Sequence, residues 1–201
     1  MKIKNLWPTP LYMNEIVPTQ DIRDFAFSAD YEKTSKSMRT VCKTVLNDLP
    51  ELKKEIEKEI DKYTRDYLKV DDDIEFYITT SWINKHKPDD YAVVHHHSNS
   101  IFSGVYYIIQ PRFSGDLLFH ENNMTPNVCN RVVLTYKEMT DTTTTHYQIP
   151  PEDGLLLLFP SFLMHSVEKN KSPHDRYSLG FNVFVKGELG VKESKLNLYA
   201  S

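Results

Sequence analysis

The chain has 201 residues, of which 40% are hydrophobic and 26% are charged, as is ordinary for a soluble globular protein. Its formal net charge is −4 and it has no block of basic residues, which argues against a nucleic-acid partner. The two cysteines, Cys42 and Cys129, follow no metal-binding spacing, so we expect a reducing compartment. The chain shows neither the apolar run of a signal peptide nor one long enough to span a bilayer. We therefore expect a cytoplasmic protein with no membrane partner.

The first 73 residues are expected to form an N-terminal strand and supporting helices. The segment from Trp7 to Tyr12, with its two prolines, is typical of an extended edge strand. Residues 21–70 are predicted to be largely helical, with Asp61 and Arg65 able to pair one turn apart. One apolar helix face, which needs a sheet to pack against, carries Leu52, Ile56, Ile60, Tyr63 and Tyr67. A solvated turn at 71–73 ends this part.

From residue 74 onward, short runs rich in β-branched and aromatic residues alternate with turn formers. The runs predicted as strands are 75–83, 91–95, 102–109, 117–120, 131–136, 144–149, 154–159 and 177–185. Such a series after a helical part predicts a mainly β fold with supporting helices, either a jelly roll or an immunoglobulin-like sandwich. We expect one domain over 1–201, with its β core at 74–186 and a tail at 187–201.

Three histidines at the end of a predicted strand are the first candidate site. Because residues i and i+2 of a strand share a face, His95 and His97 can converge on one point while His96 points away. Imidazole nitrogens suit iron, zinc or copper, although a surface histidine cluster would show the same pattern. A third ligand would have to come from a remote strand, and His165, after an apolar strand, is the candidate.

Arg176 and Ser178 open the last long strand and share one face of it. An arginine fork and a hydroxyl can together hold a carboxylate, whereas a lone arginine would more often form a surface ion pair. The order His-x-His, then His, then Arg-x-Ser therefore indicates a metal site with free positions beside a carboxylate anchor. An enzyme that binds a keto acid at both ends needs this combination.

Four stretches together resemble a 2OG-Fe(II) oxygenase family that is found in bacteria and marine phages and is related to prolyl 4-hydroxylases. The stretches are WIN at 82–84, HHHSNSIFSGVYY at 95–107, GLLLLFPS at 154–161 followed by His165, and RYSLGFN at 176–182. The resemblance covers residues 76–186, and WPTP at 7–10 also resembles the family's start. It implies a double-stranded β-helix, a cupin-like jelly roll, that uses Fe(II), 2-oxoglutarate and O2, with ascorbate a candidate reductant.

By the same resemblance, His95 and His165 are the first and the distal metal ligand. Arg176 corresponds to the arginine that binds the far carboxylate of 2-oxoglutarate, with Ser178 beside it. Tyr107 corresponds to a tyrosine that hydrogen-bonds this cosubstrate in prolyl hydroxylases.

Two further residues, Trp82 and Asn84, are expected in the pocket wall, Asn84 as a cosubstrate contact. A phage origin would put the protein in the host cytoplasm.

Position 97 departs from the wider superfamily, which has an aspartate or glutamate there. A histidine makes the metal site more positive, which a dianionic keto acid offsets in part, and it leaves the choice of metal open. His97 is the expected third ligand. Alternatives are His96, if the strand bulges, and the side chains of Asp116, His120 and Glu121 on the following strands.

The resemblance predicts hydroxylation of an unidentified substrate with release of succinate and CO2. A prolyl side chain of a protein or peptide is the first candidate, by analogy alone, and small molecules and a homodimeric assembly stay open. We expect the polar loops 122–130 and 140–145 to cover the substrate. One rival is a cupin-type three-histidine dioxygenase or zinc hydrolase, against which Arg176 and Ser178 argue. Another is a non-catalytic jelly-roll interaction protein.

Overall fold

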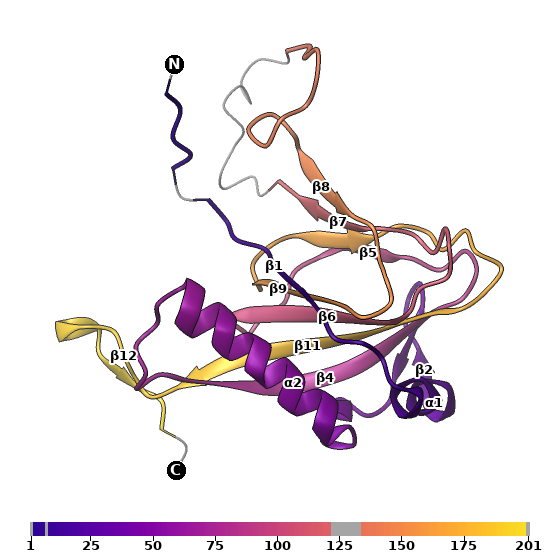
Figure 1. Cartoon of the computed structure of the whole chain (residues 1–201), viewed down its shortest axis with the longest axis horizontal. Helices are drawn as coiled ribbons and strands as arrows, with labels where there is room; N and C mark the ends of the chain where they lie inside the picture. The colour runs from indigo at the N-terminus through magenta and orange to yellow at the C-terminus, as the bar shows by residue number, and fades with distance from the viewer. Residues whose placement is uncertain (1, 7, 122–133, 200–201) are drawn as a thin grey trace.

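The computed structural model describes residues 2–6, 8–121 and 134–199, and their main feature is a pair of facing β-sheets (Figure 1). The large sheet has seven strands in the order β1-β9-β6-β11-β4-β3-β2, and the small sheet has four in the order β5-β10-β7-β8. All of these pairs are antiparallel.

The strands of the large sheet are β1 (Tyr12–Glu15), β2 (Tyr31–Lys33), β3 (Met38–Thr40), β4 (Glu75–His86), β6 (Phe102–Ile109), β9 (Leu155–Pro160) and β11 (Arg176–Lys186). Those of the small sheet are β5 (Ala92–His95), β7 (Leu117–His120), β8 (His146–Ile149) and β10 (His165–Val167). From β4 to β11 the chain crosses repeatedly from one sheet to the other. This crossing is the jelly-roll arrangement, and it decides between the two folds that the strand pattern had left open.

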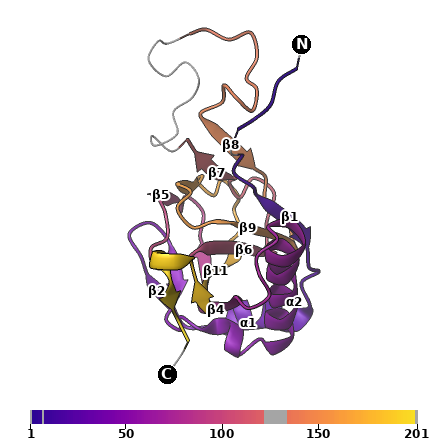
Figure 2. The ribbon, with the colours of Figure 1, turned by 90° about the vertical axis from the view of Figure 1, so that its left-hand side faces the viewer.

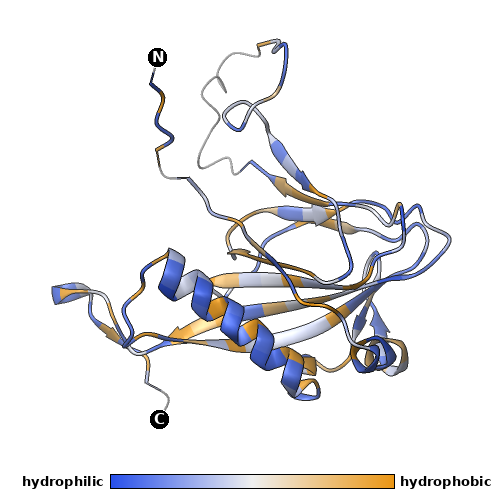
Figure 3. Cartoon of the chain, in the orientation of Figure 1, coloured by the Kyte–Doolittle hydropathy of each residue, from blue (hydrophilic) through white to orange (hydrophobic). Residues whose placement is uncertain are grey.

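Helices cover the face of the large sheet that is turned away from the small one (Figures 1 and 2). They are α1 (Gln20–Ser28), the 3-10 turn η1 (Val45–Asn47), α2 (Pro50–Asp61) and the π-helical η2 (Lys62–Tyr67). The predicted apolar face of α2 is confirmed, since Leu52, Ile56 and Ile60 are buried against the sheet. Charged residues occupy the outer face of the helix (Figure 3).

Residue alternation along β11 separates the apolar core from the space between the sheets. Tyr177, Leu179, Phe181 and Val183 pack into the core beneath the helices. The intervening residues Arg176, Ser178, Gly180 and Asn182 line a cavity on the other face. A strand with a period of two thus presents a continuous apolar face to the helices and a polar face to the cavity.

The prediction that 21–70 is largely helical is wrong for its middle part. The hairpin of β2 and β3 follows α1 and extends the large sheet at the edge beside β4. Its turn is closed locally, because the Thr34 amide donates to the Ser37 carbonyl at 2.9 Å. Such short-range hydrogen bonds compete with helix formation. The two strands have three residues each, which is too few to show an apolar periodicity in the sequence.

Other boundaries differ for identifiable reasons. The N-terminal strand begins at Tyr12, after Pro8 and Pro10, because proline has no N–H to donate to a sheet. Arg65 pairs with Asp72, at 4.0 Å, and bonds backbone carbonyls instead of reaching Asp61. Tyr67, expected on the apolar face, is exposed, since the π-helical turn changes the residue period there.

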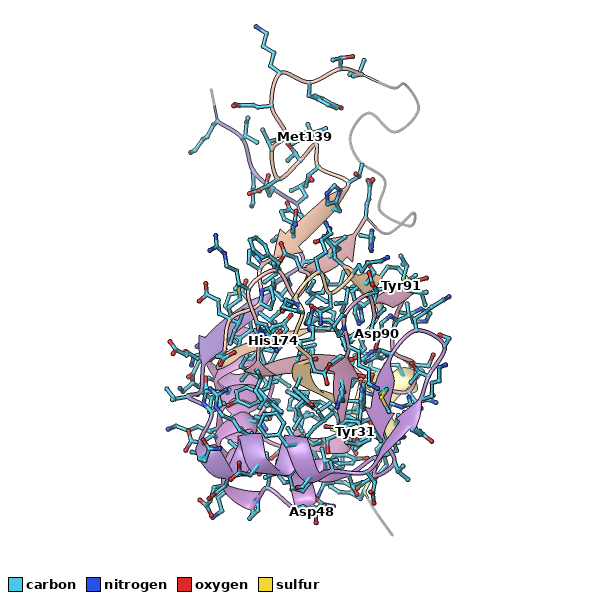
Figure 4. The ribbon with its side chains drawn as sticks, turned by 90° about the vertical axis from the view of Figure 1, so that its right-hand side faces the viewer. Tyr31, Asp48, Asp90, Tyr91, Met139 and His174 are labelled. Carbon is cyan, nitrogen blue, oxygen red and sulfur yellow. The ribbon has the colours of Figure 1, made fainter. Side chains whose placement is uncertain are left out.

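Several predicted features fall partly or wholly on positions that the structure does not describe: Trp7, Cys129, the loop 122–130 and residues 131–133 of a predicted strand. The described remainder of that strand, 134–136, forms no strand. It belongs to a segment that projects beyond the sheets and carries the exposed Met139 (Figure 4). Short strands β12 (Glu188–Leu189) and β13 (Leu196–Asn197) and the turn η3 (Lys192–Ser194) follow β11. Within the described ranges, no helix is long and apolar enough to cross a membrane.

Candidate active site

A cavity of about 480 Å³ lies between the two sheets. Its wall on the large sheet is built from rows of residues that are directly paired across neighbouring strands. In one row Ser178 of β11 pairs with Asn84 of β4 on one side and Tyr107 of β6 on the other. Directly paired residues of antiparallel strands share a face, so all three side chains reach the cavity.

The three predicted histidines meet at this cavity. His95 on β5 and His165 on β10 are cross-strand partners, with ring centroids 4.3 Å apart. His97 lies just beyond β5, and its ring centroid is 5.1 Å from that of His165. One ring nitrogen from each histidine lies within 4.8 Å of the others. His96 is exposed, as strand alternation predicted.

Hydrogen bonds leave the same nitrogen, Nε2, free on each ring. His95 Nδ1 is 2.8 Å from the carbonyl oxygen of Val93, and His165 Nδ1 is 2.8 Å from that of Leu163. Each Nδ1–H therefore donates to a backbone carbonyl, which fixes the tautomer and the ring orientation. Because Nδ1 of each ring is engaged, Nε2 is the nitrogen left for a ligand, and three such imidazoles are a donor set suited to a divalent first-row metal with free coordination positions.

The third ring, His97, is held by side chains. Its Nδ1–H donates to Asn182 Oδ1 at 2.6 Å and also lies 2.8 Å from Ser103 Oγ. Ser103 donates to the same Asn182 oxygen, and the Asn182 amide donates to Thr80 Oγ1 at 3.2 Å. The amide is thereby oriented with its oxygen toward the imidazole.

Burial keeps two of the imidazoles, those of His97 and His165, neutral and hence competent to bind a metal. Desolvation lowers the pKa of His165 to about 3, with the neighbouring histidines acting in the same direction. Burial also lowers the pKa of His97, partly opposed by its bond to Asn182. Metal ligation needs the unprotonated nitrogen, so no proton has to leave these rings at neutral pH.

The alternative ligands lie elsewhere. His120 Nε2 is 2.8 Å from Ser166 Oγ, and Asp116 accepts a hydrogen bond from Gln148 at 2.7 Å. Glu121 lines a separate pocket together with His120. Among the described residues, the group that could hold a metal ion is His95, His97 and His165.

Arg176 forms the second part of the site. It is 1% exposed, and its Nη1 donates to the carbonyls of Ser114 and Gly115 at 3.1 and 2.7 Å. Its Nε and the hydroxyl of Tyr107 are both buried without a hydrogen-bond partner. The guanidinium carbon lies 5.7 Å from the centroid of the tyrosine ring. Burial raises the pKa of Tyr107 to about 12, so the phenol stays protonated and able to donate.

These unpartnered donors fit a carboxylate. Buried polar groups are nearly always paired, so orphaned ones at a cavity wall indicate a missing ligand. A carboxylate accepts only, and it can take hydrogen bonds from both Arg176 and Tyr107. The far carboxylate of a keto acid would therefore satisfy the atoms that this cavity leaves unpaired.

Sequence reasoning identified Trp82 in the cavity wall, but it missed His86 on the same face of β4 and Asn182 on the cavity face of β11. Gly180 lies opposite Trp82, and a Cβ at this glycine would come within 2.8 Å of the indole ring. His86 lies two residues after Asn84 and Asn182 four after Ser178, and both line the cavity. Continuing the alternation along each strand would have found both.

A jelly roll that carries three converging imidazoles and a buried arginine in one cavity defines an oxygenase-type site. The family model described as "Putative 2OG-Fe(II) oxygenase" matches residues 80–182, just over half of the chain. The chain belongs to this family, and it is therefore an oxidoreductase of the Fe(II)- and 2-oxoglutarate-dependent class, built on a double-stranded β-helix.

Solved structures share this fold at low sequence identity. HygX from Streptomyces hygroscopicus, with nickel and 2-oxoglutarate bound, is 12% identical with a TM-score of 0.60, over 87% of this chain and 82% of that one. A 2OG-Fe(II) family oxidoreductase from Burkholderia pseudomallei is 14% identical, with a TM-score of 0.57 over 81% and 75%. A prolyl-4-hydroxylase from Pseudomonas putida is 12% identical, with a TM-score of 0.52 over 87% and 92%. No curated protein sequence matches the chain.

Proposed function

We propose that His95, His97 and His165 bind Fe(II) through Nε2, and that Arg176 and Tyr107 bind the far carboxylate of 2-oxoglutarate. One observation carries this proposal: a single cavity brings together three free imidazole nitrogens and two buried donors without partners. The carbonyls of Ser114 and Gly115 hold the guanidinium of Arg176 in place. Its remaining donors are therefore already oriented when a ligand binds.

When bound, the metal and cosubstrate supply the oxidising power: O2 converts 2-oxoglutarate to succinate and CO2 and leaves one oxygen atom for a substrate C–H bond. The protein positions the reactants. Arg176 and Tyr107 fix one end of the cosubstrate, and the backbone-bonded rings of His95 and His165 fix the metal end. Ser178 and Asn84 line the wall between these two ends, and both can offer hydrogen bonds to the cosubstrate.

The first substrate class to test is a prolyl side chain of a protein or peptide. The likeness to the Pseudomonas putida prolyl-4-hydroxylase supports it. A polar rim also supports a substrate larger than an amino acid, since Thr34, Ser37, Arg39 and Lys43 from the β2–β3 region line the same cavity.

Anaerobic titration with Fe(II) and 2-oxoglutarate tests the cofactor assignment, because the keto acid chelated to iron gives a visible charge-transfer band. Wild type should develop the band. We expect His97→Ala to lose iron binding, and Arg176→Ala to bind iron yet show no band at the same cosubstrate concentration. The exposed neighbour His96 gives the matched control, and His96→Ala should titrate like wild type.

If wild type binds iron and never shows the band, the proposal fails and the three-histidine dioxygenase or hydrolase takes its place. If the band appears, succinate release on addition of proline-containing peptides, with mass analysis of the peptide, tests the substrate. A gain of one oxygen atom on proline supports prolyl hydroxylation, and stimulation by other substrates alone argues against it.

A further inference from the structure

His86 is a buried histidine that has no hydrogen-bond partner on either ring nitrogen. It ends β4, is 3% exposed and lines the cavity. Its direct partner across the sheet is Arg176 on β11. A neutral imidazole always carries one N–H, and such a donor buried without an acceptor destabilises the protein unless something else pairs with it.

Three hydrogen-bond donors at this end of the cavity lack an acceptor. Arg176 Nε, the Tyr107 hydroxyl and a ring N–H of His86 are all buried and unpartnered, while Nη1 of the arginine is occupied by backbone carbonyls. No hydrogen bond joins these three groups to one another, although the Tyr107 oxygen and the second ring nitrogen of His86 could each accept one. A carboxylate has two oxygens that together accept several hydrogen bonds, so one such group can pair with all three.

We propose that His86 donates a hydrogen bond to the far carboxylate of 2-oxoglutarate, and so helps to select 2-oxo acids that carry a second carboxylate. The inference rests on the proposed function and adds a residue to it.

A neutral imidazole suits this role. Burial, together with the adjacent guanidinium of Arg176, lowers the pKa of His86 to about 3. The ring therefore offers an N–H without placing a second cation beside Arg176.

The test compares two ligands that differ only at the carboxylate. 2-Oxoglutarate and 2-oxopentanoate have the same carbon chain, but the second lacks the far carboxylate. Their dissociation constants are measured anaerobically on the Fe(II)-loaded protein from the visible band. In wild type we expect a large preference for 2-oxoglutarate. His86→Leu removes the donor, and we expect it to reduce this preference about tenfold or more, while iron affinity and 2-oxopentanoate binding stay near wild type.

Two controls separate the hydrogen bond from a packing effect. His86→Gln keeps an N–H donor and should retain most of the preference. His174 is an exposed histidine outside the set of residues that line the cavity, and His174→Gln should change neither constant.

An unchanged preference in His86→Leu overturns the inference and leaves the proposed function intact. Absence of 2-oxoglutarate binding by wild type overturns both. If the variants fail to fold, a crystal structure of the wild-type complex decides. A ring nitrogen of His86 within hydrogen-bond distance of the carboxylate supports the inference, and a larger separation contradicts it.

Discussion

The Asn182 side chain is the acceptor that holds the proposed third metal ligand in place. Its oxygen takes the Nδ1–H of His97 at 2.6 Å, and its amide is fixed by Thr80. Partners of this kind commonly contribute 10–100-fold to metal affinity. We therefore predict that Asn182→Leu weakens Fe(II) binding by about 10–100-fold, measured anaerobically by competition with a chelator.

The matched variant is Asn182→Asp, which keeps an acceptor oxygen at nearly the same place. It should bind iron at least as tightly as wild type, because a carboxylate makes the imidazole a stronger ligand. Equal iron affinity in Asn182→Leu and wild type would contradict this role of Asn182 and leave Ser103 and packing to hold the His97 ring.

The sequence allowed prediction of those site residues that form an unusual combination of residue types. A His-x-His pair, a distant histidine and Arg-x-Ser indicate a metal and a carboxylate, and the structure brings His95, His97 and His165 together. His86 and Asn182 carry no such signal. Their roles depend on burial and on the cross-strand partners Arg176 and Thr80, which local sequence does not specify.

At the scale of elements, a buried carboxylate joins the N-terminal strand to the main helix. Glu59 of α2 is 4% exposed and accepts from Tyr12 and Asn14 of β1, both at 2.6 Å, and from Lys62 at 2.7 Å. Burial opposes ionisation, yet these three hydrogen bonds hold the pKa of Glu59 below its usual range. The ionised carboxylate thus ties two elements that lie far apart in sequence.

We predict that Glu59→Ala lowers the free energy of unfolding by about 1–3 kcal/mol, because it removes the acceptor shared by Tyr12 and Asn14 of β1 and by Lys62. Urea denaturation followed by circular dichroism measures the change. Glu55 is exposed on the same helix, so Glu55→Ala should change stability by only about 0.5 kcal/mol. Similar losses in both variants would contradict a specific role for Glu59.

Elements with a clear hydrophobic periodicity could be predicted from the sequence, whereas short strands that form only by pairing with other strands could not. The alternation of β11 and the apolar face of α2 follow from the sequence because each buries one face. The hairpin of β2 and β3 has three residues in each strand, too few to show a period. Strand β10 was also missed, since its three residues are ordered by pairing with β5 and β7 on both sides.

At the scale of the whole molecule, the buried neutral histidines couple stability to pH. His86 has a folded-state pKa of about 3, below the usual value of 6.5, so the unfolded chain binds more protons between these values. The contribution of His86 is fully present above about pH 6.5 and is lost as the pH falls toward 3. Charged or titratable groups that act on this end of the cavity are Arg176, Tyr107 and Asp116. The arginine and the tyrosine keep their charge states over this range.

We predict that the metal-free wild type loses stability faster than His86→Gln as the pH is lowered from 6 to 4. The difference between their unfolding free energies should change by about 1.4 kcal/mol per pH unit, since one proton is taken up on unfolding. Urea denaturation at several pH values measures both curves, with the exposed His174→Gln expected to follow wild type. Parallel curves for wild type and His86→Gln would mean that the pKa of His86 is the same in the folded and the unfolded chain, which would contradict a buried neutral ring at this position.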